Sequence, residues 1–152
     1  MEDATVKFKL LDACRHYVEQ RLGTATLAMN NAQQAANAEG KSSAGDKYET
    51  GRAMMQIERD TAARQVEEAL KMKRVVDQID PSVTHQRIAL GSLAITTLFN
   101  VYVAIGTGKM EIEGEPFVIV GPESPLAKVL LGRVASEQFT FNNRVNTILR
   151  IL

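Results

Sequence analysis

A regular apolar repeat runs through the first quarter of the chain, from about Thr5 to Asn37. This segment has no proline and one glycine, and its apolar residues alternate between spacings of four and three, with Arg15 filling the one gap. A heptad repeat of this kind predicts a long helix that supercoils left-handedly with a partner helix. Alanine dominates the second half of the repeat, so the partner must approach closely there. The repeat consists of Leu11, Val18, Leu22, Ala25, Met29, Ala32 and Ala36.

The partner helix is expected next along the chain. Residues 38–45 are small, polar and glycine-bearing, which is typical of a turn between helices. A second helical pattern runs from about Asp46 to Ile79, and Pro81 cannot continue it. Each helix would measure about 45 Å, and the short turn makes the two antiparallel neighbours. We therefore expect residues 1–80 to form an antiparallel coiled-coil hairpin, with a second seam of Met55, Ala62, Val66, Ala69, Leu70, Val76 and Ile79.

The pattern changes after Pro81 from helices to strands. Runs rich in β-branched and aromatic residues alternate with turn sequences at 106–108, 113–116 and 142–143. We expect residues 81–152 to form a small antiparallel sheet, which makes the whole chain an α+β protein. The expected strands lie within Ile88–Thr97, Val101–Ile105, Phe117–Val120, Phe139–Phe141 and Val145–Leu152.

One short helix is expected among these strands, at 124–132. Ser124 is a good N-cap residue, Pro125 suits the first helical position, and Gly132 suits the position after the C-cap. This helix would pack on the sheet.

The charge balance argues against a protein that binds nucleic acid by itself. Residues 1–80 carry 12 Lys and Arg against 13 Asp and Glu, and residues 81–152 carry 6 against 5, which together give the 18 and 18 of the chain. Neither part has the excess of positive charge that autonomous DNA or RNA binding requires. No run of residues approaches the length of about 20 apolar residues needed to span a membrane, and no signal peptide is visible.

Cysteine and histidine usage also limits the possible chemistry. Cys14 is the only cysteine, so no intrachain disulfide and no cysteine zinc site can form, which favours a reducing cytoplasm. Cys14 lies on the apolar face of the first helix and is expected to be a small core residue. His16 and His85 lie in different segments without a ligand or triad pattern, and we expect packing or surface roles for both.

Two carboxylates lie where the hairpin should turn, in the run Gly45-Asp46-Lys47-Tyr48-Glu49. Asp46 can cap the second helix and Glu49 can reach back to it, as in a capping box, which explains both residues structurally. The same spacing also places both carboxylates on one helical face. Mg²⁺ often binds through one or two carboxylates while other ligands come from water or phosphate, so this pair could complete a metal site in a partner.

These features together resemble the Gre transcript-cleavage factors of bacterial RNA polymerase, over nearly the whole chain. The Gre pattern Gly-Asp-x-x-Glu at the hairpin tip is matched by Gly45, Asp46 and Glu49. A Gly-Ser near the first strand is matched by 91–92, and the Gre helix that begins Ser-Pro-Leu is matched by 124–132.

The resemblance implies a fold and a mechanism. Residues 81–152 would adopt an FKBP-like fold and dock at the rim of the secondary channel of the polymerase, with Ser124, Pro125 and Leu126 as partner-binding residues. The coiled coil would enter the channel, where Asp46 and Glu49 would help to hold a Mg²⁺ ion shared with the polymerase. The polymerase would then hydrolyse backtracked RNA near its 3′ end. The chain itself would be an accessory factor and not an enzyme, without a tightly bound cofactor.

Two other hypotheses remain open. Lys47, Tyr48 and Gly51 differ from the usual Gre tip, and Lys47 adds a positive charge beside the acids. A diverged regulator or inhibitor that binds the same channel without stimulating cleavage would fit these differences. The third hypothesis is a coiled-coil interaction protein in which Asp46 and Glu49 act only as caps.

Overall fold

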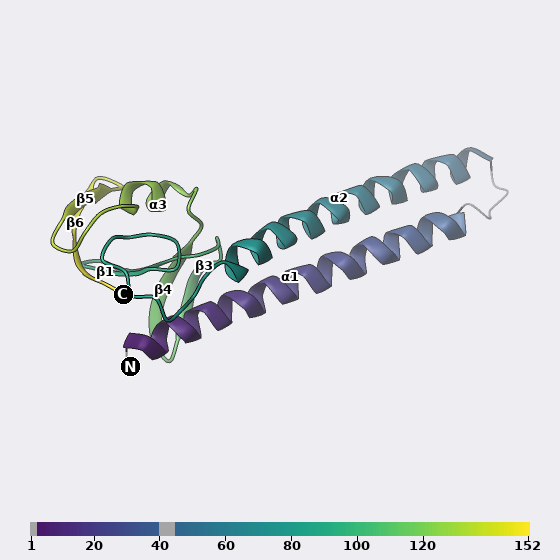
Figure 1. Ribbon diagram of the computed structural model, residues 1–152. Coiled ribbons are helices and arrows are strands. Elements are labelled where there is room, and N and C mark those ends of the chain that lie inside the picture. The colour runs from purple at the N-terminus through teal and green to yellow at the C-terminus, as the bar shows by residue number, and fades with distance from the viewer. Residues whose placement is uncertain (1–2, 40–44) are drawn as a thin grey trace. The chain divides into compact units, whose positions relative to one another are not determined.

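The computed structural model describes residues 3–39 and 45–152, and it begins with two long helices (Figure 1). Helix α1 spans Asp3–Glu39 and helix α2 spans Gly45–Asp77. Both predicted helices are confirmed, with ends that differ from the predictions by two residues at most. Residues 40–44, which form most of the predicted turn, lie outside the described residues.

The chain divides into two compact units, one of which is made of two separate stretches of the sequence. Tyr17–Lys73 form one unit, and Met1–His16 together with Arg74–Leu152 form the other. We call them the helical unit and the sheet unit. The first turns of α1 and the last turn of α2 thus belong to the sheet unit.

The helical unit is built on small side chains. Within it α1 and α2 lie side by side and run in opposite directions (Figure 1), and Gln65 of α2 lines the same pocket as Tyr17 and Ala25 of α1. The alanines of the predicted seams are buried, because only a side chain this small lets two helices approach closely. Leu70 is a predicted seam residue that is 37% exposed. The buried seam residues of this unit are Val18, Ala25, Ala32, Ala36, Ala62 and Ala69.

The sheet unit contains a six-stranded sheet in the order β3-β4-β2-β1-β6-β5. The expectation of a wholly antiparallel sheet is wrong, because β2 pairs with β4 in parallel, with Val101 opposite Val118. All other neighbouring strands are antiparallel. The strands are β1 Leu93–Thr96, β2 Asn100–Val103, β3 Gly108–Ile112, β4 Glu115–Val120, β5 Gln138–Phe141 and β6 Arg144–Ile151.

The parallel pair arises from β3, a strand that the sequence prediction missed. The chain leaves β2, runs back along the edge of the sheet as β3, and turns into β4, which fills the place between β2 and β3. Only Met110 and Ile112 are apolar side chains in β3, and neither is fully buried. An edge strand with one solvent-exposed face does not require a run of β-branched residues, so the sequence pattern that would predict this strand is weak.

Tight turns fix the register of two hairpins. Glu113 and Gly114 have φ values of 53° and 83°, and they join β3 to β4. Asn142 and Asn143, with φ values of 49° and 62°, join β5 to β6. Two consecutive residues with positive φ make the type I′ turn that matches the twist of paired strands, and Gly and Asn adopt it at low cost. The predicted turn at 142–143 is confirmed. Of the turn predicted at 113–116, residues 113–114 form the turn, and Glu115 and Pro116 already belong to β4.

Helix α3, Pro125–Leu130, covers one face of the sheet and closes its core. The Ser124 Oγ accepts a hydrogen bond from the Ala127 N–H at 3.2 Å, so Ser124 is the N-cap. Gly132, with φ of 84°, follows the C-cap residue Leu131. The predicted helix and both of its end signals are confirmed. Its buried residues Leu126, Ala127 and Leu130 belong to one core cluster with Ile88, Ala94, Val101, Val103, Val120, Phe139 and Ile148.

Removing the cap of α3 should destabilise the sheet unit measurably. In Ser124→Ala the Ala127 N–H loses its acceptor, and we expect a loss of about 0.5–2 kcal/mol in the free energy of unfolding. Urea denaturation measures it. Ser124→Asp is the matched control, because Asp also caps helices well and should keep most of the stability. An equal loss in both variants would contradict the capping role.

Candidate functional site

The two acidic residues singled out in the sequence belong to the first turn of α2. Asp46 and Glu49 both have helical backbones, and Glu49 is exposed. The side chains of residues 45–48 lie outside the described residues, so the position of the Asp46 carboxylate is not part of the geometry. Positions three apart share a helical face. The backbone therefore places Glu49 and Asp46 on one side of α2, at the end of the helical unit where α1 finishes and α2 begins (Figure 1).

This pair would supply only part of a metal site. Within residues 3–39 and 45–152, no three or more His, Cys, Asp or Glu side chains whose placement is described are grouped so that they could hold a metal ion. Mg²⁺ requires six oxygen ligands in a near-octahedral arrangement. Two carboxylates must therefore share the ion with water or with ligands from another molecule.

The Ser-Pro-Leu motif has a clear structural role in the sheet unit. Ser124 caps α3, and Leu126, 7% exposed, packs into the core. Pro125 is exposed at the first turn of the helix. Of the three residues predicted to bind a partner, Pro125 thus presents the accessible surface, while Ser124 and Leu126 hold that surface in place.

Cys14 is a core residue, as predicted. Its side chain is fully buried, and burial raises the pKa of the Cys14 thiol to about 12. A thiol that stays protonated is a poor nucleophile. The buried Tyr102 hydroxyl has no hydrogen-bond partner among the residues that the structure describes. Burial raises the pKa of Tyr102 above its usual range, and the neighbouring Cys14 adds to the effect.

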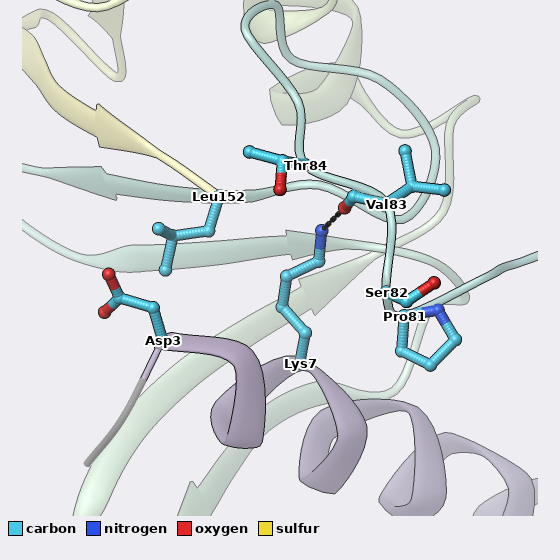
Figure 2. A pocket seen from close by; sticks show the side chains of 7 residues that line it. All are labelled: Asp3, Lys7, Pro81, Ser82, Val83, Thr84 and Leu152. Carbon is cyan, nitrogen blue, oxygen red and sulfur yellow. Dashed lines mark hydrogen bonds between the residues drawn. The ribbon is translucent and has the colours of Figure 1, made fainter.

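A second cluster, which the sequence prediction missed, surrounds Lys7 in the sheet unit (Figure 2). Lys7 is only 3% exposed. Its Nζ donates to the Val83 carbonyl oxygen at 2.6 Å and lies 3.3 Å from Nδ1 of His85. Burial lowers the pKa of Lys7, and attraction to Asp80 opposes this. A sequence signal did exist, because Lys7 precedes Leu11 by four positions and therefore lies on the apolar face of α1.

His85 has a correspondingly altered acidity. Burial lowers the pKa of His85 below its ordinary value of 6.5, the positive charge of Lys7 lowers it further, and a hydrogen bond with the Leu152 backbone opposes both. An ammonium group can only donate, so His85 Nδ1 is the acceptor in this pair. The neutral imidazole is thus the form that the folded protein favours. The sequence predicted a packing or surface role for His85, and the structure shows a partly buried side chain in this cluster.

Acidification should therefore weaken the sheet unit. A His pKa that is lowered by folding contributes stability that is complete above the unfolded value of 6.5 and is lost as the pH falls through the folded value. We expect the urea midpoint to fall between about pH 7 and about pH 5, and to fall less in His85→Gln, which does not titrate. The same slope in His85→Gln and wild type would contradict this assignment.

The comparisons with known proteins give no relative. No family model, no curated protein and no solved structure matches this chain. In the described part of the chain, no helix combines the length and the apolar character required to cross a bilayer. Functional inference therefore rests on the residues and their geometry.

Proposed function

We propose that this chain is a Gre-like accessory factor of bacterial RNA polymerase, located in the cytoplasm, that stimulates cleavage of backtracked RNA. The observation that carries the proposal is the joint placement of Asp46 and Glu49 in the first turn of α2, where the two long helices meet. The order of sequence features after it, from the Pro81 break to the Ser124-Pro125-Leu126 helix, supports the same family.

In this proposal the two units have separate tasks. The sheet unit, as an FKBP-like domain, docks on the polymerase through the surface that Pro125 presents at α3. The helical unit acts as a coiled-coil hairpin that enters the secondary channel. Its residues 17–39 and 45–73 correspond to roughly 35 Å and roughly 43 Å of helix, lengths suited to reaching a buried catalytic centre.

The chemistry would take place in the active site of the polymerase. Asp46 and Glu49 would add carboxylate ligands to a second Mg²⁺ ion that the polymerase and the RNA phosphate also bind. A Mg²⁺ ion between such ligands orients a water molecule and lowers its pKa, so that the water attacks the RNA phosphodiester near the 3′ end. The chain forms no bond to the RNA and is not itself an enzyme. Because the polymerase and the RNA would supply the remaining ligands, two carboxylates from this chain would be sufficient to complete the Mg²⁺ site.

A stalled and backtracked polymerase tests the proposal. The protein is added with Mg²⁺, RNA length is followed on a gel, and binding to the polymerase is measured in parallel by co-migration. Shortening of the RNA supports the proposal. Binding with slower elongation and no shortening would favour the rival channel regulator, to which the charge of Lys47 beside the acids points. Absence of binding would remove both polymerase hypotheses and leave an interaction protein with capped helices.

A further inference from the structure

The Lys7 cluster opens into a pocket of about 260 Å³ in the sheet unit. Figure 2 shows Lys7 extending from α1 toward the segment that follows Pro81, with Leu152 and Asp3 on the other side. A pocket of this size can hold a compound of a few carbon atoms. Besides Lys7, its wall consists of Asp3, Pro81, Ser82, Val83, Thr84 and Leu152.

The ammonium group of Lys7 lacks a bound counter-charge. Among the described residues, no carboxylate lies within ion-pairing distance of Lys7, and its two acceptors, Val83 O and His85 Nδ1, are neutral. Lys9, two residues further along α1, differs because it forms an ion pair with Glu113. Because a buried cation without an adjacent anion is poorly stabilised, the ammonium group of Lys7 loses a proton more readily than that of an exposed lysine, which gives the nucleophilic amine.

Both carboxylates near Lys7 are engaged elsewhere. Asp3 forms an ion pair with Arg150 at 2.5 Å. Asp80 accepts hydrogen bonds from the Ser82 backbone N–H at 2.9 Å and from the Ser82 hydroxyl at 2.6 Å. These contacts direct the two negative charges to other partners, and only the longer-range attraction of Asp80 still favours the charged form of Lys7.

We propose that Lys7 is a reactive amine that captures small aldehydes in this pocket as an imine. The arrangement of a buried lysine, a neutral imidazole nitrogen 3.3 Å away and an adjoining cavity has the parts that imine formation needs. Nothing in this step depends on RNA polymerase, so it is a second activity of the chain, independent of the cleavage function proposed above.

The reaction balances without an oxidant or a reductant. His85 Nδ1 takes a proton from the Lys7 ammonium, and the freed amine attacks the carbonyl carbon to form the C–N bond. A proton moves from nitrogen to the new alkoxide, which gives a carbinolamine. His85 then returns its proton to the hydroxyl, the C–O bond breaks and water leaves. The products are a protonated imine on Lys7, one water and neutral His85.

Competitive labelling tests this proposal on the whole protein. Propanal is supplied in limiting amount near pH 7 with cyanoborohydride, which reduces each imine to a stable propylamine, and peptide mass spectrometry gives the rate for each lysine. Lys109 and Lys128 are exposed internal standards. We expect Lys7 to be labelled on the order of tenfold faster than either. Labelling of Lys7 at the same rate or more slowly, as burial alone would cause, would overturn the proposal.

Two variants separate reactivity from mere accessibility. His85→Gln keeps a polar side chain without a titrating nitrogen, and it should slow labelling of Lys7 by on the order of tenfold or more. Thr84→Phe places a large side chain on the exposed wall of the pocket and should also slow Lys7. Lys128 should be unaffected in both, and its rate shows in each sample that reagent and protein are equivalent. Unchanged labelling of Lys7 in both variants would overturn the proposal.

Discussion

Asp46→Asn and Glu49→Gln should each reduce stimulated cleavage of backtracked RNA by at least on the order of 100-fold, because changes even in residues that only support metal ligands cost 10–100-fold. Each substitution replaces an anionic oxygen ligand by a neutral amide of the same size. The fold of α2 should remain, since both substitutions keep the size of the side chain and fall in the first turn of a helix of 33 residues. Cleavage rate as a function of Mg²⁺ concentration is the measurement, and excess Mg²⁺ should partly restore the activity of each single variant.

Glu58→Gln is the matched control, because Glu58 is also an exposed acid on α2 and lies well beyond its first turn. It should cleave at the wild-type rate. Binding to the polymerase should be equal in all three variants, since docking is assigned to the sheet unit. If Asp46→Asn and Glu49→Gln cleave as well as Glu58→Gln does, the carboxylates are caps and the metal assignment is wrong.

The helices could be predicted almost completely from the sequence, for a physical reason. A heptad repeat reports burial at every turn over more than thirty residues, and Pro81 ends the pattern sharply. The same repeat predicted burial of Ala25, Ala32 and Ala69, which the structure has. The repeat did not predict that the first turns of α1 belong to the sheet unit. An apolar helix face has the same sequence pattern whether a helix or a sheet covers it.

Strand positions were predicted better than strand partners. Five of the six strands were expected near their observed positions, and the two turns with positive φ were found from Gly114 and Asn142-Asn143. Pairing is a long-range property that a run of residues does not encode. The place of β4 beside β2 depends on β3, an edge strand whose residues carry a weak signal.

The two candidate sites differ in how visible they are in the sequence. The acids at 46 and 49 are adjacent in the chain, so their spacing alone indicates a shared helical face. In the Lys7 cluster, Lys7 contacts Val83 and His85, which lie 76 and 78 positions further along the chain. No local pattern can report such a contact. The one local sign, a lysine on an apolar helix face, becomes meaningful only when the fold shows that neutral acceptors surround it.

Truncation of Leu130 should produce the largest loss of stability among the variants considered. Its side chain is 0% exposed and lies in the core between α3 and the sheet. Leu130→Ala removes several methyl and methylene groups and leaves a cavity that the sheet below cannot close, so we expect the free energy of unfolding to fall by about 2–5 kcal/mol. Urea denaturation followed by near-ultraviolet circular dichroism measures this loss.

Leu131→Ala is the matched control for that loss. Leu131 is the next residue along the chain and is 37% exposed, so the same truncation there should cost less than about 1 kcal/mol. Equal losses would mean that α3 is not docked on the sheet as described. Because Ser124 and Pro125 are held by this helix, Leu130→Ala should also weaken binding to the polymerase, whereas the carboxylate variants at 46 and 49 should not. The variants at Leu130 and Leu131 thus report on the stability of the sheet unit, and the variants at 46 and 49 report on cleavage.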